Sequence, residues 1–167
     1  MGDSILFHNK LLFMNMGINR IEKRMIEAMA VTPLILEIAQ RIGWEEALAI
    51  LRDVNQKEAF QRGQYLSVEL GRNGIDELID EVAEWGRGGE WEMDVLEKTG
   101  STYFFNVTKC PYYEKYKELG LEEFGEEFSC CREKYFARGF NSNLRLVRKN
   151  TIMEGADHCD FRYYLEV

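Results

Sequence analysis

The sequence predicts an α+β fold, with a helical N-terminal half packed on an antiparallel sheet of about four strands that two helices interrupt. Apolar residues recur at three- and four-residue intervals up to about residue 86, which is typical of amphipathic helices. After the glycine-rich stretch at residues 86–89 they alternate in short segments, as in strands with one buried face. The 167 residues fit a single domain, in which residues 1–86 form a helical layer and residues 90–167 the sheet with its two inserted helices.

The helical half is predicted from the spacing of its apolar residues. Five segments have helical spacing: residues 4–16, 18–29, 33–42, 44–70 and 76–85. Thr32 offers a capping hydroxyl and Pro33 suits the first turn of a helix, so we expect a helix to begin there and to end at Gly43. Together these helices are expected to cover one face of the sheet.

The second half is expected to mix strands with helices. Strands are predicted over residues 90–96, 102–108, 144–153 and 160–167. Helices are predicted over residues 111–119 and 121–138, and residues 98–101 suit a hairpin turn. Alternation gives two strands a shared apolar face, formed by Tyr103, Phe105, Val107, Phe161 and Tyr163.

Charge and composition limit the classes of partner that we expect the protein to bind. Lys and Arg number 21 against 29 Asp and Glu, so the net charge is −8, which disfavours nucleic acid and anionic membrane surfaces. No apolar run reaches the roughly 18 residues of a membrane-spanning helix, and the first residues lack the features of a secretory signal. We therefore expect a cytoplasmic protein with a small-molecule substrate or ligand, no nucleic-acid or membrane partner, and a homodimer as one of its possible states.

All four cysteines lie between residues 110 and 161, which indicates a site rather than scattered core thiols. In a reducing compartment such thiols serve catalysis, metal binding or packing rather than disulfides. Cys110 precedes Pro111 at the start of a predicted helix, where a thiol has a depressed pKa and is more nucleophilic. Cys130 and Glu133 share a helix face, so the carboxylate is placed to accept a proton from water. Buried structural thiols and a solvated glutamate are the alternatives.

Four further residues are candidates for the same site. Arg148 is expected either to bind a small carboxylate through its planar fork or to pair with Glu154 or Asp160. Cys159 and Asp160 alternate in direction on a strand, so only one of them faces a given pocket. Asn141 is expected to orient a substrate amide or to cap a turn.

Zinc is a further alternative, because three cysteines with nearby acids are possible ligands. The intervals between Cys110, Cys130 and Cys159 match no compact zinc finger, so we expect neither a metal nor an organic cofactor.

One combination of motifs carries a family resemblance. It consists of Cys110-Pro111, Cys130 with an acid three residues later, Gly139-Phe140-Asn141, Arg148-x-x-Thr151 and Gly155-x-x-x-Cys159-Asp160-Phe161. These motifs cover about the last third of the chain. In this combination the chain resembles the L-2-amino-thiazoline-4-carboxylic acid hydrolase family. The acid after the second cysteine is usually aspartate in that pattern, whereas Glu133 here keeps the charge and moves it by one methylene.

The resemblance implies a cofactor-free hydrolase that opens a small cyclic amidine or thiazoline ring. Such a reaction needs a nucleophile or activated water, a proton donor for the leaving atom and a cation for the substrate carboxylate. The candidate catalytic residues are Cys110, Cys130, Glu133, Cys159 and Asp160. The candidate substrate-binding residues are Asn141 and Arg148.

The C-terminal pattern is also similar to small-molecule-binding domains of the vinyl-reductase type, some of which hold zinc through a Glu-x-x-Cys pair. The equivalent positions here are Arg148 and Thr151, neither of which is a zinc ligand. This second resemblance implies a similar fold and gives the alternative function of a non-catalytic sensor domain.

Overall fold

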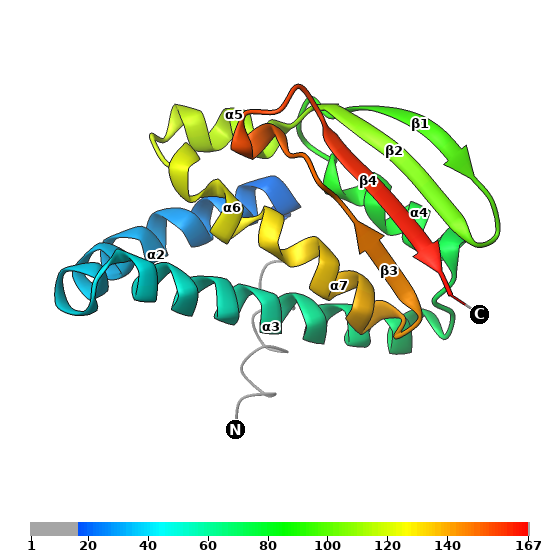
Figure 1. Cartoon of the computed structure of the whole chain (residues 1–167), viewed down its shortest axis with the longest axis horizontal. Helices are drawn as coiled ribbons and strands as arrows, with labels where there is room; N and C mark the ends of the chain where they lie inside the picture. The colour runs from blue at the N-terminus through cyan, green and yellow to red at the C-terminus, as the bar shows by residue number, and fades with distance from the viewer. Residues whose placement is uncertain (1–16, 167) are drawn as a thin grey trace.

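The computed structural model of the chain describes residues 17–166 (Figure 1). The helices are α2 (Arg20–Ile42), α3 (Trp44–Leu70), α4 (Ile75–Trp85), α5 (Pro111–Glu118), α6 (Gly125–Phe128) and α7 (Glu133–Phe140). The strands are β1 (Glu92–Lys98), β2 (Thr102–Lys109), β3 (Leu144–Val147) and β4 (Cys159–Leu165). Three short 3₁₀ helices are η1 (Glu122–Phe124), η2 (Cys130–Arg132) and η3 (Ile152–Glu154). The helix expected over residues 4–16 lies outside the described residues.

The four strands form one antiparallel sheet in the order β1-β2-β4-β3, which confirms the α+β class. The apolar face predicted for the strands is the buried one. Phe105 on β2 pairs with Phe161 on β4, and their rings stack with centroids 4.8 Å apart. Tyr103 and Tyr163 extend the same layer of aromatic rings and are almost completely buried.

Helices cover this aromatic face of the sheet. In Figure 1, α7 lies between the long helix α3 and strand β3, and side chains of α3, α4 and α7 join those of the strands in one hydrophobic cluster. Two glycines allow α3 and α7 to approach closely. A Cβ atom on Gly63 would lie 2.3 Å from the carbonyl oxygen of Phe136, and one on Gly139 would lie 2.0 Å from that of Phe60.

A second hydrophobic cluster lies between α2, α3, α5 and α6. Tyr112 and Tyr116 of α5 are buried there beside residues of the N-terminal helices. Both clusters take side chains from before and after the glycine-rich stretch at residues 86–89, and Trp91 and Cys110 pack against both. The glycine-rich stretch therefore does not divide the hydrophobic core in two.

Helix α2 runs continuously through the point where two helices were expected, so the predicted start at Thr32 is wrong. The Thr32 hydroxyl donates a hydrogen bond to the carbonyl of Ala28 at 2.7 Å instead of capping a new helix. Pro33 costs one backbone hydrogen bond. Burial of both halves against neighbouring helices nevertheless keeps the helix continuous through the proline. The buried apolar residues of α2 lie on both sides of it: Ile21, Met25, Ala28, Ile35 and Ala39.

The second inserted helix, expected over residues 121–138, is broken into η1, α6, η2 and α7, so that prediction is wrong in its continuity. The chain bends at Ser129, which has φ −124° and ψ −62°. The bend lets Phe128 enter the second cluster while Phe136 enters the cluster on the sheet.

Strand β3 also ends earlier than expected. The carboxylate of Asp160 accepts hydrogen bonds from the backbone N–H groups of Lys149 and Asn150, at 2.9 and 2.6 Å. Because these two N–H groups donate to a side chain, they do not pair with a neighbouring strand. The residues that follow form η3 instead of continuing β3.

Within residues 17–166, no helix combines the length and the apolar character needed to cross a bilayer.

Candidate functional site

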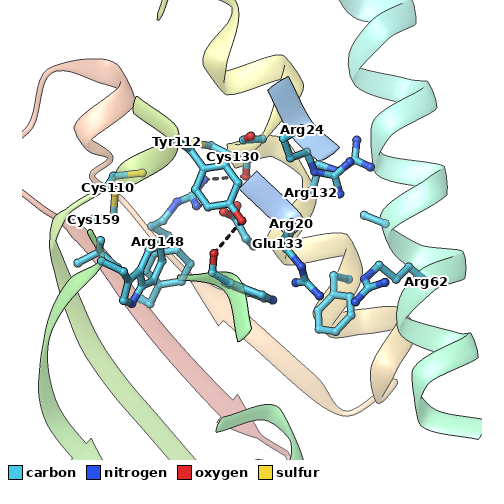
Figure 2. Close-up of a pocket in the computed structure, with 17 residues that line it drawn as sticks. Arg20, Arg24, Arg62, Cys110, Tyr112, Cys130, Arg132, Glu133, Arg148 and Cys159 are labelled. Carbon is cyan, nitrogen blue, oxygen red and sulfur yellow. Dashed lines mark hydrogen bonds and ion pairs between the residues drawn. The ribbon is translucent and has the colours of Figure 1, made fainter. Parts of the chain in front are cut away.

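A cavity of about 80 Å³ lies between the buried face of the sheet and the helices α2, α3, α5 and α7 (Figure 2). Its apolar wall includes Trp85, Val107, Phe136 and Phe161. Most of its polar side chains fall into two sets. We call Cys110, Cys130, Cys159 and Glu133 the thiol cluster, and Arg20, Arg24, Arg62 and Arg132 the arginine wall. Figure 2 shows Cys110 and Cys159 on the side of the cavity opposite the arginine wall.

Glu133 is the carboxylate that lines the cavity. Its Oε2 accepts a hydrogen bond from Nη1 of Arg148 at 2.7 Å, and the second Nη group of Arg148 donates to the carbonyl of Cys130 at 2.9 Å. Burial raises the pKa of Glu133 above its ordinary value, and Arg148 opposes this rise only in part. A carboxyl with a raised pKa is a stronger base than an ordinary glutamate, and it can accept a proton and return it to a leaving group.

Arg148 follows β3 and reaches across the sheet to this site. Its guanidinium lies over the ring of Phe161, 5.2 Å from the centroid. Although burial opposes its charge, Glu133 raises the pKa of Arg148, so it stays cationic. Both Nη groups of Arg148 already donate to protein acceptors. This limits the part that Arg148 can play in binding a substrate carboxylate.

Cys110 occupies the N-cap position of α5, with the extended backbone that a residue before proline adopts (φ −113°, ψ 107°). The position agrees with the sequence prediction, but the pKa does not. Burial raises the pKa of the Cys110 thiol, although the backbone N–H groups of Tyr113 and Tyr112 lower it in part. The thiol is therefore protonated near neutral pH and needs a base to become a nucleophile.

The other two cavity thiols are also held in the neutral form. Burial raises the pKa of Cys130 well above its ordinary value and that of Cys159 to about 12. The Sγ of Cys159 accepts a hydrogen bond from the backbone N–H of Ile152 at 3.2 Å, which fixes its orientation. The negative charge of Glu133 disfavours ionisation of all three thiols, so the carboxylate and the thiols belong to one electrostatic unit.

The structure separates Asp160 and Asn141 from the cavity. Cys159 faces inward, and Asp160, the next residue on β4, points away and orders residues 149–150. Asn141 caps the end of α7, and its side-chain amide donates to the backbone carbonyl of Asn73 at 3.0 Å. Both residues shape the chain around the site, and neither lines it.

The arginine wall was not predicted from the sequence. Arg20 and Arg62 both donate to one oxygen of Glu81, at 2.6 and 3.1 Å. Arg24 pairs with Glu27, and Arg132 pairs with Glu58 and donates to Asn55. Nε of Arg132 is buried and has no hydrogen-bond partner among the described residues. In sequence, these arginines have the spacing of ordinary helix-surface charges, and only the four-residue interval between Arg20 and Arg24 indicated a shared face.

A metal site would need several ligands with free lone pairs at suitable distances. Among residues 17–166, no group of three or more His, Cys, Asp or Glu side chains is arranged to hold a metal ion.

The chain was compared with known families and with curated proteins. The sequence model of the family described as L-2-amino-thiazoline-4-carboxylic acid hydrolase matches residues 23–163. The chain belongs to this family. No match was found among curated proteins.

The motifs shared with the L-2-amino-thiazoline-4-carboxylic acid hydrolase family divide into two sets in the structure. The cavity is lined by Cys110, Cys130, Glu133, Arg148, Cys159 and Phe161. The remaining motif residues build the frame. Gly139 permits the contact with α3, Phe140 is buried in the core, and Thr151 caps η3 through a hydrogen bond from the N–H of Glu154.

Proposed function

We propose that the protein is a hydrolase that opens the ring of a small cyclic amidine or thiazoline, with L-2-amino-thiazoline-4-carboxylate as the type of substrate. The observation that carries the proposal is the partly buried Glu133 carboxyl, held by Arg148 in the wall of a cavity that three thiols share. The proposal needs no organic cofactor. Family membership supports hydrolysis, and the cationic lining of the cavity supports an anionic substrate.

In the proposed first step, Cys110 is the nucleophile and Glu133 the base. The thiol adds to the ring carbon that lies between nitrogen and sulfur, and its proton passes to Glu133. The bond from that carbon to the ring sulfur then breaks, because a thiolate is a better leaving group than an amide-like nitrogen. Glu133 returns the proton to the departing sulfur, so this step releases the substrate thiol and leaves the carbon bonded to Cys110.

In the proposed second step, water takes the place of Cys110. Glu133 accepts a proton from the water as its oxygen adds to the same carbon, and the bond to Cys110 breaks. The Cys110 thiol regains the proton, and the carbon leaves as a urea. One water is consumed for each ring opened, and the product carries one free thiol. Arg148 acts through Glu133 by holding the carboxyl at the cavity wall.

A turnover assay tests the proposal. The purified chain is incubated with L-2-amino-thiazoline-4-carboxylate, and NMR follows both loss of the ring and appearance of the ring-opened product. After the protein is removed by filtration, a thiol reagent should detect one new thiol per substrate consumed. Binding of the compound without turnover would contradict the proposal and would support the alternative, a non-catalytic small-molecule-binding domain.

A further inference from the structure

We infer that Arg20 and Arg62, on the arginine wall, form the subsite that recognises the carboxylate of the substrate and so determine specificity for acidic rings. The inference rests on the proposed function, because it names the residues that would bind one group of that substrate. It moves this role away from Arg148, the residue to which the sequence assigned it.

The geometry brings two guanidinium groups to one edge of the cavity. Arg20 comes from the first turn of α2 and Arg62 from the middle of α3, and in Figure 2 their guanidinium groups lie next to each other. Both donate to the same oxygen of Glu81, which also accepts from Nε1 of Trp85 at 3.3 Å. Glu81 thus holds the two arginines together and leaves other N–H groups of each fork available to a ligand.

The charges around this edge are not balanced. Two guanidinium groups share the single carboxylate of Glu81, whose pKa they lower despite its burial. Burial, and then the neighbouring charge of Arg62, lower the pKa of Arg20, and Glu81 opposes this lowering only in part. One bound carboxylate would supply the missing negative charge, in a site shielded enough for the interaction to be strong.

Each of the remaining cavity arginines has a carboxylate partner of its own. Arg24 and Arg132 are matched by the carboxylates of Glu27 and Glu58. Arg148 has its two Nη groups on Glu133 and on the carbonyl of Cys130. Among the ion pairs of the described residues, Arg20 and Arg62 are therefore the two cavity arginines that share a single carboxylate.

The position of the pair also suits the proposed chemistry. The arginine wall lies across the cavity from Cys110, so a small ring held there by its carboxylate would direct the opposite edge toward the thiol cluster. Arg20 precedes residues 23–163, the stretch that matches the family model. Arg62 lies within that stretch.

Binding of two matched compounds tests the inference. The probes are 2-aminothiazole-4-carboxylate, an aromatic ring that resists opening, and 2-aminothiazole, which lacks the carboxylate. Dissociation constants are measured by calorimetry for the wild type, for Arg62→Gln and for Arg62→Lys. Arg41→Gln is the control, because it removes an exposed arginine from α2 that pairs only with Glu37 among the described residues. Melting temperatures confirm that each variant is folded.

We expect the wild type to prefer the carboxylate compound. Arg62→Gln should reduce this preference by about 10- to 100-fold, the range for a charged hydrogen bond, while the affinity for 2-aminothiazole stays the same. Arg62→Lys should retain part of the preference, because it keeps the charge and loses the fork. Arg62→Gln should fold, since Glu81 retains Arg20 and Trp85 as partners.

Three results would overturn the inference. Arg62→Gln could keep the wild-type preference for the carboxylate compound, or it could lose affinity for both compounds equally. The third result is that the wild type does not bind the carboxylate compound. The test is separable from that of the proposed function. If the preference depends on Arg62 but the thiazoline ring is never opened, the subsite stands and the hydrolase proposal fails. If the ring is opened with the same KM in Arg62→Gln, the hydrolase proposal stands and the subsite fails.

Discussion

Glu133 and Arg148 form a partly buried ion pair, with 2.7 Å between Oε2 and Nη1, that joins the first residue of α7 to the residue after β3. The same arginine donates to the carbonyl of Cys130, so one side chain fixes both members of the Cys130-x-x-Glu133 motif. This contact links the helical break at residues 129–132 to the sheet. The pairing with Arg148 also compensates the charge of the Glu133 carboxylate in a cavity that is otherwise partly apolar.

Replacing Arg148 tests the strength of this pair. Arg148→Met should lower the free energy of unfolding by about 3 kcal/mol, because it leaves the partly buried carboxyl of Glu133 without its partner. Arg41→Gln, which removes an exposed arginine, should change it by less than about 0.5 kcal/mol. Urea denaturation of both variants and the wild type measures these values. Equal stability of the two variants would show that the pair is not an important contact.

Glu133 should also make stability depend on pH. Because burial raises its pKa above the ordinary value of 4.5, the folded protein holds this proton more tightly than the unfolded chain does. The stabilisation is fully present below pH 4.5 and is lost as the pH rises through the raised folded pKa. Melting temperatures of the wild type and of Glu133→Gln, measured across this range, should shift in favour of the variant as the pH rises. A constant difference, or a shift in favour of the wild type, would contradict the raised pKa.

Gly139 should be intolerant of any side chain. Gly139→Ala would place a Cβ atom 2.0 Å from the carbonyl oxygen of Phe60, where neither backbone can easily move, and should cost about 3 kcal/mol of stability. The control is Gly100→Ala in the β1–β2 turn, where a Cβ atom meets nothing within 4 Å. Chemical denaturation compares the two. If Gly139→Ala were no less stable than Gly100→Ala, the close contact between α3 and α7 would be wrong.

The order of elements could largely be predicted from the sequence because it depends on local patterns. The helix expected over residues 44–70 has the bounds of α3, and the alternation on β2 and β4 gave the correct buried face. The errors are at Thr32 and Ser129, where tertiary packing overrides local signals. At Thr32 a continuous buried stripe overrides a helix-start signal, and at Ser129 two separate clusters demand a bend.

The candidate site could be predicted only in part. The clustering of cysteines in sequence indicated Cys110, Cys130 and Cys159, and the structure brings these thiols to one cavity. The arginine wall could not be found this way, because its members come from α2, α3 and η2 and meet only through helix packing. The depressed pKa expected for Cys110 depended on exposure of the helix end, and burial reverses its direction.

Metal content gives an independent check on the chemistry. Five arginines and one glutamate line the cavity, so its charge should repel a cation. Elemental analysis of protein purified without added metal should find well under one equivalent of zinc or iron. A near-stoichiometric content would contradict this expectation and would favour Cys110, Cys130 and Cys159 as ligands.

The role of Glu133 can be separated from that of the thiols by the pH dependence of turnover. A base must be ionised to act, so activity should fall as the pH drops through the raised pKa of Glu133. Glu133→Gln should reduce kcat by about 100- to 10,000-fold, the range for loss of a general base. Steady-state rates between about pH 4 and 8 measure the effect. A variant with wild-type kcat would exclude Glu133 as the base.

The most direct test of the account is the turnover of L-2-amino-thiazoline-4-carboxylate by Cys110→Ser, with Cys131→Ser as the matched control. Cys131 is a buried thiol whose Sγ donates to the carbonyl of Glu127 and does not line the cavity. Both variants should melt close to the wild type. The account predicts that Cys110→Ser produces no ring-opened product while Cys131→Ser retains wild-type turnover. Wild-type turnover by Cys110→Ser would contradict it.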